Sequence, residues 1–451
     1  MAQNDITNVF KAYDVRGKVG SELNSDSVGL MGQALATWLP NSGIVAVGRD
    51  MRPDSAELAS AMIEGLRAQG RDVWDIGEVT SDMIYFAVGN FGLAGGAMIT
   101  ASHNPGEYNG IKFCREEAKP IGEDSGLLEI RDLVLAGNFP TDAPLGNVVE
   151  KDLAEDWITH VLSFVDTKKM KPLTIAVDAG NGMAGKIFPE LEPYVPFQVE
   201  EMYFELDGTF PNHIANPLIP ENIVDLQNEV RSKKLDAGIA FDGDGDRAVL
   251  IDEYGEPLTG TVMTALLAEY FLDKNHGATI LYNAICGRAA SDAIEKSGGK
   301  GIRTRVGHSF IKSYMREHDA VFAGEHSGHY YFRDNYMADS GLIAAVIALY
   351  ILSTSNKPLS KVVEKYRKAY VQIPETNFEV EDKQAMIDKI AAAFLTEKQD
   401  KLDGLTVNFE NGWFNVRPSN TEPVLRFNAE AKNKAELEQI VAKVTNLITN
   451  A

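Results

Sequence analysis

Three aspartates alternate with two glycines in the segment FDGDGDR. Like charges this close repel one another unless a cation lies among them, and oxygen-only ligands favour a hard divalent ion. The pattern therefore predicts a Mg²⁺ site, rather than a zinc site, formed by Asp242, Asp244 and Asp246. An EF-hand is a weaker alternative, because its sixth position requires glycine and here holds Arg247, and because the flanking runs read as strands. A solvated acidic turn is the other alternative.

A second polar stretch, ITASHNPGEYNGIKF, contains Ser102, His103 and Lys112. A serine hydrolase would place glycine two residues to either side of its nucleophile, but Thr100 and Asn104 stand there. We expect His103 to point away from Ser102 at a strand end, which excludes it as the base of such an enzyme. A helix N-cap does not fit either, because the following residues, PGEYNG, do not read as a helix. What remains is a serine on an exposed loop, and a metal ion facing its oxygen is chemically sensible if that oxygen carries a phosphoryl group.

A third stretch, VRPSNTEPVLRF, concentrates hydrogen-bond donors in one turn. Guanidinium, hydroxyl, amide and backbone N–H groups together can surround a phosphate, which arginine binds through two parallel hydrogen bonds. For this stretch alone an ordinary capped turn is an equally good interpretation, because serine, asparagine and threonine favour turns anyway. The candidate phosphate-binding residues are Arg417, Ser419, Asn420, Thr421 and Arg426.

A fourth stretch, GEHSGHYYF, places carboxylate, hydroxyl and imidazole groups between a strand-like run and an aromatic run. Such groups suit the hydroxyls of a sugar, which predicts sugar binding by Glu325, Ser327 and His329. The two histidines of the stretch also fit a metal site or a satisfied polar turn. Metal binding is the weaker of these, because an aspartate-rich site already exists elsewhere in the chain.

The elements that position these stretches repeat an α/β theme, in which a β-branched run, a loop and an amphipathic helix follow one another. In the first repeat, residues 43–50 and 95–102 read as strands and 55–70 as a helix, which predicts a βαβ unit. The apolar run 342–352 is too short to cross a bilayer and predicts a buried helix. The predicted domains comprise residues 1–148, 149–254, 255–368 and 369–451.

The overall charge of the chain restricts its partners. A formal net charge of −22 opposes binding to nucleic acid or to an anionic membrane surface. Cys114 and Cys286 are the only cysteines, too few for a disulfide framework, which favours a reducing cytoplasm. No basic segment followed by an apolar run begins the sequence, so no secretory signal is expected. We therefore expect a cytoplasmic protein that binds neither nucleic acid nor membranes.

Taken together, TASHNP, DGDGDR, GEHSGH and RPSNTEP resemble, in this order and at this spacing, the motifs of the α-D-phosphohexomutase family. The resemblance covers nearly the whole chain. It implies an α/β fold of three related mixed α/β domains and a smaller C-terminal α+β domain around a central cleft. It also implies that Ser102 carries the transferred phosphoryl group and binds Mg²⁺ together with the three aspartates.

By the same resemblance, Arg16 and Lys112 face the phosphoserine, and Arg247 neutralises phosphoryl oxygens beside the metal loop. The proton of the sugar hydroxyl needs an acid or base, for which Lys112, His103 and His308 are candidates that the sequence does not separate. Hexose phosphates are the implied substrates, and a hexose 1,6-bisphosphate is the implied intermediate and activator.

The opening FKAYDVRG and the RPSNTEP stretch resemble the phosphomannomutase/phosphoglucomutase branch, whereas phosphoglucosamine mutases typically read GTDGVRG and RPSGTEP. Two positions depart from that branch. His326 stands where GEMSGH has methionine, and Ile285 stands where a lysine often precedes a cysteine. Arg288 and Arg305 are the residues that could replace the missing lysine.

The resemblance implies an isomerase that moves a phosphoryl group between O1 and O6 of mannose or glucose. A phosphoglucosamine mutase, a metal-dependent sugar phosphatase and a non-catalytic sugar-phosphate binder are the alternatives. A monomer or weak homodimer is expected. The sequence does not distinguish mannose from glucose as the preferred hexose.

Overall fold

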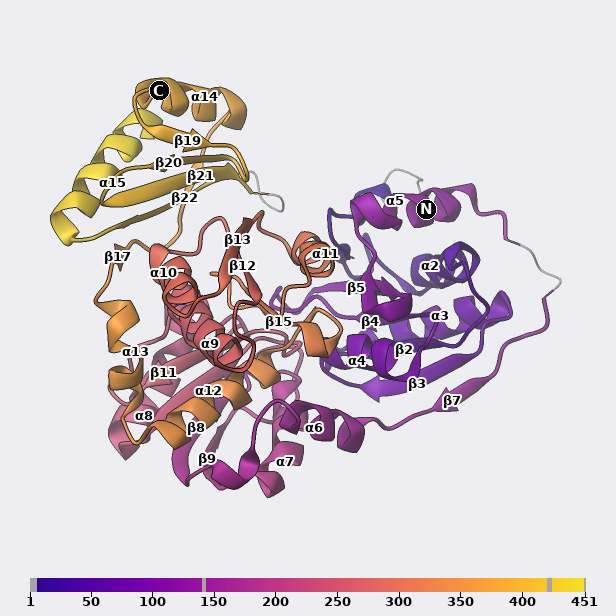
Figure 1. The fold of residues 1–451 in the computed structure, drawn as a ribbon. Coiled ribbons are helices and arrows are strands. Elements are labelled where there is room, and N and C mark those ends of the chain that lie inside the picture. The colour runs from indigo at the N-terminus through magenta and orange to yellow at the C-terminus, as the bar shows by residue number, and fades with distance from the viewer. Residues whose placement is uncertain (1–5, 140–142, 420–423, 450–451) are drawn as a thin grey trace. The chain divides into compact units, whose positions relative to one another are not determined.

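The computed structural model describes residues 6–139, 143–419 and 424–449. The chain divides into two compact units: Met1–Leu258 with Gly328–Ser360, and Thr259–Ser327 with Lys361–Ala451. Each unit contains β-sheets covered by helices, which confirms the predicted α/β class (Figure 1). The four domain boundaries and the central cleft stay predictions.

The first sheet of the first unit has the strand order β1-β5-β4-β2-β3-β7, with β6 beside β5. β2 pairs in parallel with both β3 and β4. The sequence analysis predicted that one helix connects β2 directly to β4, which was wrong, because β3 and α4 lie between them in chain order. β3 was missed because it is only half-buried and carries polar residues. The elements are β1 (Val15–Lys18), α2 (Ser25–Trp38), β2 (Val45–Arg49), α3 (Ser55–Ala68), β3 (Val73–Glu78), α4 (Ser81–Phe91), β4 (Gly95–Ile99), β5 (Tyr108–Arg115), β6 (Lys119–Pro120), α5 (Leu127–Ala136) and β7 (Val148–Glu150).

Apolar side chains from α2, α3 and α5 form the core on one face of this sheet, together with Val45 and Val47 of β2. Because neighbouring residues of a strand face opposite sides, Gly48 faces the other side, where Ile84 of α4 packs. The sheet is therefore covered on both faces, as expected for parallel strands. β7 begins at Val148 and pairs with β3, so the predicted boundary between residues 148 and 149 falls inside a strand of this sheet.

The second sheet of the first unit has the order β11-β10-β8-β9. β8 and β10 are parallel, whereas β10 and β11 form an antiparallel pair joined by the segment that contains the three aspartates. Strands on both sides of this segment exclude the EF-hand alternative, which requires helices. The elements are α6 (Ala154–Leu162), β8 (Leu173–Asp178), α7 (Ala184–Leu191), β9 (Phe197–Met202), α8 (Val224–Lys233), β10 (Ala237–Phe241) and β11 (Ala248–Asp252).

The first unit also contains the antiparallel strands β15 (Tyr330–Phe332) and β16 (Ala338–Asp339) and the helix α12 (Gly341–Ser355). α12 is buried over most of its length, which confirms the prediction of a buried apolar helix. Within the described residues no single helix is long and apolar enough to cross a membrane; the pair of α12 and α13 (Leu359–Arg367), bent by 107°, passes by length and composition only.

The second unit contains a parallel group of strands in the order β13-β12-β14 and a C-terminal sheet in the order β17-β22-β21-β20-β19, with β18 beside β22. The C-terminal sheet is antiparallel and packs one apolar face on α14 and α15, which confirms the predicted α+β domain (Figure 1). The elements are α9 (Gly260–Lys274), β12 (Thr279–Asn283), α10 (Arg288–Lys296), β13 (Lys300–Thr304), α11 (His308–His318), β14 (Phe322–Gly324), β17 (Val371–Gln372), β18 (Thr376–Glu379), α14 (Lys383–Ala393), β19 (Lys398–Asp400), β20 (Leu405–Asn408), β21 (Gly412–Pro418), β22 (Val424–Ala431) and α15 (Lys434–Thr449).

A histidine–carboxylate pair at the end of β8 makes stability depend on pH. His213 Nε2 lies 3.0 Å from Oδ2 of the buried Asp178. Burial lowers the pKa of His213, but the hydrogen bond and charge of Asp178 outweigh burial and raise it above its ordinary value. The pair therefore stabilises the fold fully below the pKa of the unfolded histidine, and this contribution disappears as pH rises through the folded pKa. We expect His213→Gln to lower the free energy of unfolding by about 1.5 kcal/mol at pH 5.5 and by much less at pH 8.5.

Urea unfolding at the two pH values measures this difference. The exposed His276 supplies the control, since His276→Gln should leave both midpoints unchanged. An equal loss of stability for His213→Gln at both pH values would contradict the ionic contribution.

Candidate active site

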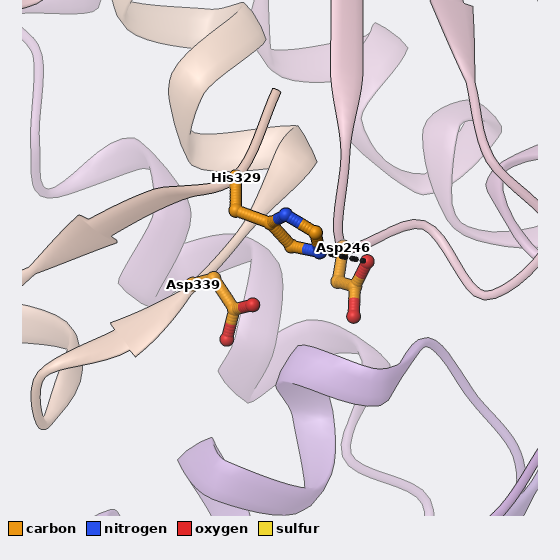
Figure 2. A group of neighbouring side chains, drawn as sticks. All are labelled: Asp246, His329 and Asp339. Atoms are coloured by element: carbon orange, nitrogen blue, oxygen red, sulfur yellow. Dashed lines mark ion pairs between the residues drawn. The ribbon is translucent and has the colours of Figure 1, made fainter. Parts of the chain in front are cut away.

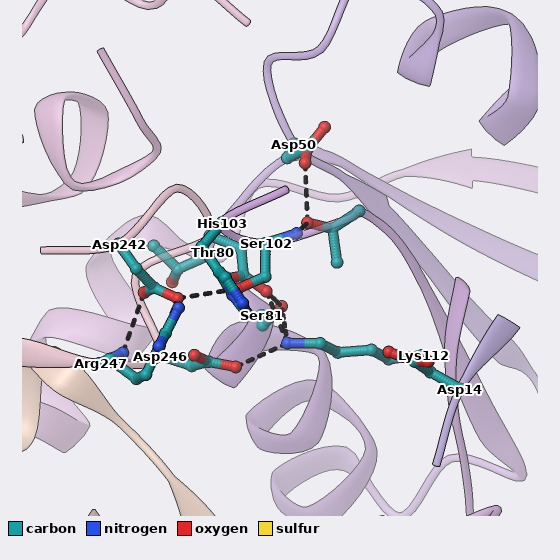
Figure 3. Close-up of polar contacts among 12 residues, drawn as sticks. Asp14, Asp50, Thr80, Ser81, Ser102, His103, Lys112, Asp242, Asp246 and Arg247 are labelled. Atoms are coloured by element: carbon teal, nitrogen blue, oxygen red, sulfur yellow. Dashed lines mark hydrogen bonds and ion pairs between the residues drawn. The ribbon is translucent and has the colours of Figure 1, made fainter. Parts of the chain in front are cut away.

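Ser102 lies in the loop that follows β4 and is almost fully buried, so the prediction of an exposed loop was wrong for this residue. Its φ of 48° is in the left-handed region, which is unusual for a residue other than glycine and is found at functional sites. The Ser102 hydroxyl donates a 2.8 Å hydrogen bond to Asp242 Oδ2 (Figure 3). The predicted phosphoryl-carrying oxygen therefore touches a carboxylate of the predicted metal loop.

A buried guanidinium holds this loop in its conformation. Arg52 Nη2 donates to the backbone oxygens of Ser102 and Asn104, at 2.8 and 2.6 Å, and Nη1 donates to those of Pro105 and Tyr108, both at 2.8 Å. Asp50, which is fully buried, pairs with Arg52 Nε at 3.2 Å. The sequence analysis missed Arg52, although the charged run GRDMRPDS, which begins at the end of β2, was a usable signal.

The structure corrects the predicted orientation of His103. Its Nδ1 lies 3.1 Å from Ser102 Oγ, whereas the sequence predicted that the two side chains point apart. The alternation of side chains applies only within a strand, and β4 ends at Ile99, three residues before the serine. Burial lowers the pKa of His103 well below its ordinary value, and the charges of Arg247 and Arg16 add to this effect. His103 is therefore a neutral imidazole beside the serine.

The three aspartates lie in the connection from β10 to β11 and are buried. Each of them offers a carboxylate oxygen, and these oxygens lie within 4.8 Å of one another. The glycines between them permit close approach, since a Cβ on Gly243 would lie 2.5 Å from the backbone oxygen of Ser102, and Gly245 has a φ of +76°. The spacing Gly-Asp-Gly is thus required for the serine loop and the aspartate loop to meet.

Unpartnered atoms in this cluster test whether a cation fits. Among the residues that the structure describes, Asp244 Oδ1 and Asp246 Oδ1 are buried without a hydrogen-bond partner, and so is Arg247 Nη2. A buried carboxylate oxygen without a partner is costly unless a cation or donor meets it. The donor set and its burial fit a hard divalent cation. The free Nη2 donor of Arg247 is suited to a phosphoryl oxygen.

Two cations of the chain neutralise part of the acidic cluster. Lys112 Nζ lies 2.6 Å from Oδ2 of both Asp244 and Asp246, and Arg247 Nε donates to Asp242 Oδ2 at 2.9 Å (Figure 3). Burial opposes the charge on Lys112, but Asp244 and Asp246 outweigh burial and raise the pKa of Lys112 well above its ordinary value. Burial likewise works against ionised Asp244, yet Lys112 holds the pKa of Asp244 below its ordinary value. Lys112 therefore stays protonated at neutral pH.

The N-terminus of α4 holds the metal loop from a second side. The backbone N–H of Ser81 donates to the backbone oxygen of Asp244 at 2.9 Å, and the Ser81 hydroxyl donates to Asp244 Oδ2 at 2.5 Å. Asp82 next to it accepts hydrogen bonds from Thr80 and from Ser340, the N-cap residue of α12, and burial raises its pKa to about 7. The sequence analysis missed this support, although the segment TSD before an apolar run is a helix-start signal.

Arg16 and His329 complete the part of the site that belongs to the first unit. Arg16 Nη1 donates to Asn104 Oδ1 at 2.8 Å, beside the serine loop. His329 belongs to the first unit and lies at the metal loop, with Nε2 3.7 Å from Asp246 Oδ1. Its sugar binding together with Glu325 and Ser327 stays a prediction. Figure 2 shows the imidazole between the carboxylates of Asp246 and Asp339.

The other predicted residues belong to the second unit. Glu325 is buried, and its Oε1 accepts hydrogen bonds from Asn283 Nδ2 and from the backbone N–H of Gly307. His308 is the first residue of α11, and Ser327 follows β14.

The donor-rich turn of the C-terminal sheet is described in part. Arg417 and Ser419 are buried, and Arg426 is a register partner of Arg417 across β21 and β22. Glu375, which sequence reasoning missed, accepts from Arg417 at 2.7 Å and from Arg426 at 3.1 Å. No side-chain pattern around Glu375 in IPET distinguishes it from a surface glutamate. Two further predictions, Asn420 and Thr421, lie outside the described residues.

The structure also places the two arginines that were considered as replacements for a lysine at Ile285. The guanidinium of Arg288 donates to the backbone oxygens of Phe409, Glu410 and Gly412 at 2.8 to 2.9 Å. It therefore binds to the C-terminal sheet and is not free to replace the lysine. Arg305 lies over the ring of Phe310, 4.3 Å from its centroid.

The chain matches four family models in sequence order. They are described as phosphoglucomutase/phosphomannomutase alpha/beta/alpha domain I, over residues 7–140, domain II, over 155–255, domain III, over 259–370, and the C-terminal domain, over 375–447.

Curated relatives and solved structures match over nearly the whole length. A protein named phosphohexose mutases from Xanthomonas campestris is 39% identical over 97% of this chain and 98% of its own length. Proteins named phosphomannomutase from Vibrio cholerae and Escherichia coli K12 are 38% and 37% identical, covering 97% and 98% of this chain and 98% of their own lengths. A phosphoglucomutase/phosphomannomutase family protein from Burkholderia thailandensis superposes with a TM-score of 0.90 at 32% identity, covering all of this chain and 98% of that one.

Proposed function

Because the chain belongs to the phosphoglucomutase/phosphomannomutase family, as the resemblance predicted, we propose that it is a phosphomannomutase that also accepts glucose phosphates. The reaction converts hexose 1-phosphate to hexose 6-phosphate through a phosphorylated Ser102 and a hexose 1,6-bisphosphate. One observation carries the proposal: Ser102 Oγ lies 2.8 Å from Asp242 Oδ2, so a phosphoryl group on that oxygen would lie at the acidic cluster. The names of the relatives favour phosphomannomutase over phosphoglucosamine mutase.

In the first half-reaction the bond between Ser102 Oγ and phosphorus breaks, and a bond from phosphorus to the free sugar hydroxyl oxygen forms. The second half-reaction returns the other phosphoryl group to Ser102 after the bisphosphate has turned over. Mg²⁺ held by Asp242, Asp244 and Asp246 with Ser102 would neutralise charge on the phosphoryl group. The same bisphosphate, added from outside, would phosphorylate Ser102 and so act as activator.

Among the three candidate acid–base residues, the electrostatics support different roles. Lys112 stays protonated, so it serves to neutralise phosphoryl oxygens rather than to accept a proton. His103 is neutral and lies beside Ser102 Oγ, so it is a candidate for moving the proton at the serine oxygen when the phosphoryl group leaves or returns. His308, which belongs to the second unit, stays a candidate acid or base.

A coupled assay with Mg²⁺ on mannose 1-phosphate, glucose 1-phosphate and glucosamine 1-phosphate, with and without glucose 1,6-bisphosphate, tests the function. We expect mannose 6-phosphate and glucose 6-phosphate to form with almost no free phosphate. Stoichiometric release of phosphate would instead identify a phosphatase. Equal rates with the aminosugar would place the chain in the phosphoglucosamine mutase branch.

A further inference from the structure

Two arginines of the C-terminal sheet stand directly opposite each other. Arg417 of β21 and Arg426 of β22 are register partners, so their side chains project from the same face with Cβ atoms about 5 Å apart. Like charges directly opposite one another on a sheet repel and are destabilising. Only 5% of the Arg417 side chain is exposed, so water screens this repulsion poorly. The pair needs an anion to hold it together.

One carboxylate supplies that charge. Glu375 Oε2 lies 2.7 Å from Arg417 Nη2, and Oε1 lies 3.1 Å from Arg426 Nη1, so each oxygen serves one guanidinium. The backbone fixes this carboxylate, because Glu375 directly precedes β18, whose residues Thr376 and Asn377 pair with β22. The exposed fraction of the Glu375 side chain is 25%, which makes the contact stronger than a fully solvated ion pair.

The contacts of Glu375 with Arg417 and Arg426 leave positive charge and a hydrogen-bond donor that could bind another anion. Two guanidinium groups and one carboxylate carry a net positive charge. Arg417 Nε is buried and, among the described residues, has no hydrogen-bond partner. A buried charged donor without an acceptor is costly, which points to a ligand that meets it. Ser419, two residues after Arg417, is also buried and adds a hydroxyl to the same end of the strand.

The geometry points to Glu375 as a positioning residue for phosphate binding: by bridging Arg417 and Arg426, it holds the guanidinium of Arg417 in the orientation that binds the non-reacting phosphate of the hexose phosphate. This assignment rests on the proposed function for the identity of the ligand. Glu375 itself does not touch the phosphate. The opposite role, in which Glu375 competes with phosphate for the arginines, predicts the opposite sign in every measurement below.

Glu375→Gln keeps the size of the side chain and removes its charge. We expect KM for mannose 1-phosphate to rise about tenfold while kcat changes less than about threefold, because the lost contact binds substrate and transition state alike. Glu379→Gln is the matched control, since Glu379 lies exposed at the other end of β18, and its KM should match that of the unmodified protein. A lower KM for Glu375→Gln would show competition and overturn the assignment, and so would an unchanged KM.

A binding measurement separates this assignment from the proposed function. Inorganic phosphate should raise the thermal midpoint of the unmodified protein and of Glu379→Gln, and should raise that of Glu375→Gln less. A smaller effect of phosphate on Glu375→Gln supports the positioning role whether or not the protein shows mutase turnover. If turnover is absent, the proposed function is wrong, but the role of Glu375 in phosphate binding still stands. If Glu375→Gln does not fold, it is replaced by Glu375→Asp, which keeps the charge on a shorter side chain. A KM above the unmodified value then supports the assignment, and a KM at or below that value overturns it.

Discussion

Ser102→Ala is expected to lower the mutase kcat by about 10³-fold or more, because the variant loses the oxygen that carries the phosphoryl group between the two sugar positions. The substitution leaves the surrounding structure with little reason to change, since alanine is smaller and what is lost is the 2.8 Å hydrogen bond to Asp242 and the 3.1 Å contact with His103 Nδ1. Activity is measured with mannose 1-phosphate, Mg²⁺ and glucose 1,6-bisphosphate. The phosphate content of the peptide that contains residue 102 is measured by mass spectrometry.

The control for this experiment is Ser232→Ala, since Ser232 is exposed on α8 and its hydroxyl bonds only to a backbone oxygen. It should keep full activity and leave the phosphate on Ser102 unchanged. Equal thermal midpoints for the two variants would show that the loss is chemical. Substantial turnover by Ser102→Ala, or active protein that never carries phosphate at Ser102, would rule out a phosphoserine enzyme.

The sequence predicted those parts of the fold in which local pattern and tertiary environment agree. β10 and β11 read as apolar runs on both sides of the acidic loop, and α12 read as a uniformly apolar helix; both are buried in the structure. β3 was missed because its burial is partial and its residues do not alternate cleanly. The predicted direct connection from β2 to β4 was therefore wrong as well, although these two strands do pair in parallel. Periodicity reports burial, so a half-buried strand gives a weak signal.

The predicted site residues share a property that the missed ones lack. Ser102 and the three aspartates stand in short segments dense with polar and glycine residues, where chemistry is visible without a structure. Ser81 and Arg52 reach the two loops across 163 and 50 residues of chain, through hydrogen bonds that form only in the folded protein. The local signals at TSD and GRDMRPDS mark a helix start and a charged turn, but they do not say which distant loop these residues contact. The prediction that His103 points away from Ser102 was wrong for a related reason. The backbone at Ser102 has a left-handed loop conformation, so the alternation of side chains along a strand does not apply there.

Lys112→Met is expected to change catalysis and metal binding in opposite directions. Lys112 Nζ lies 2.6 Å from carboxylate oxygens of both Asp244 and Asp246, whose charges outweigh burial and raise the pKa of Lys112 well above its ordinary value. Without it, two buried carboxylates lose their neutralising cation, so their affinity for Mg²⁺ should rise about tenfold. The kcat should fall about 10²- to 10³-fold, because the positive charge beside the transferred phosphoryl group is lost. Mg²⁺ affinity is measured by isothermal titration, and kcat at saturating Mg²⁺.

The variant without metal should also be less stable, because an uncompensated buried charge costs about 3 to 5 kcal/mol, and Mg²⁺ should restore much of this loss. Lys119→Met, on the neighbouring strand β6, is the control: its ion pair with Glu117 is partly solvated, so neither Mg²⁺ affinity nor kcat should change. Tighter Mg²⁺ binding together with slower turnover is a combination that general misfolding cannot produce. Weaker Mg²⁺ binding by Lys112→Met would mean that the cation is bound away from Asp244 and Asp246, and the assignment of the acidic loop as the metal site would fall with it.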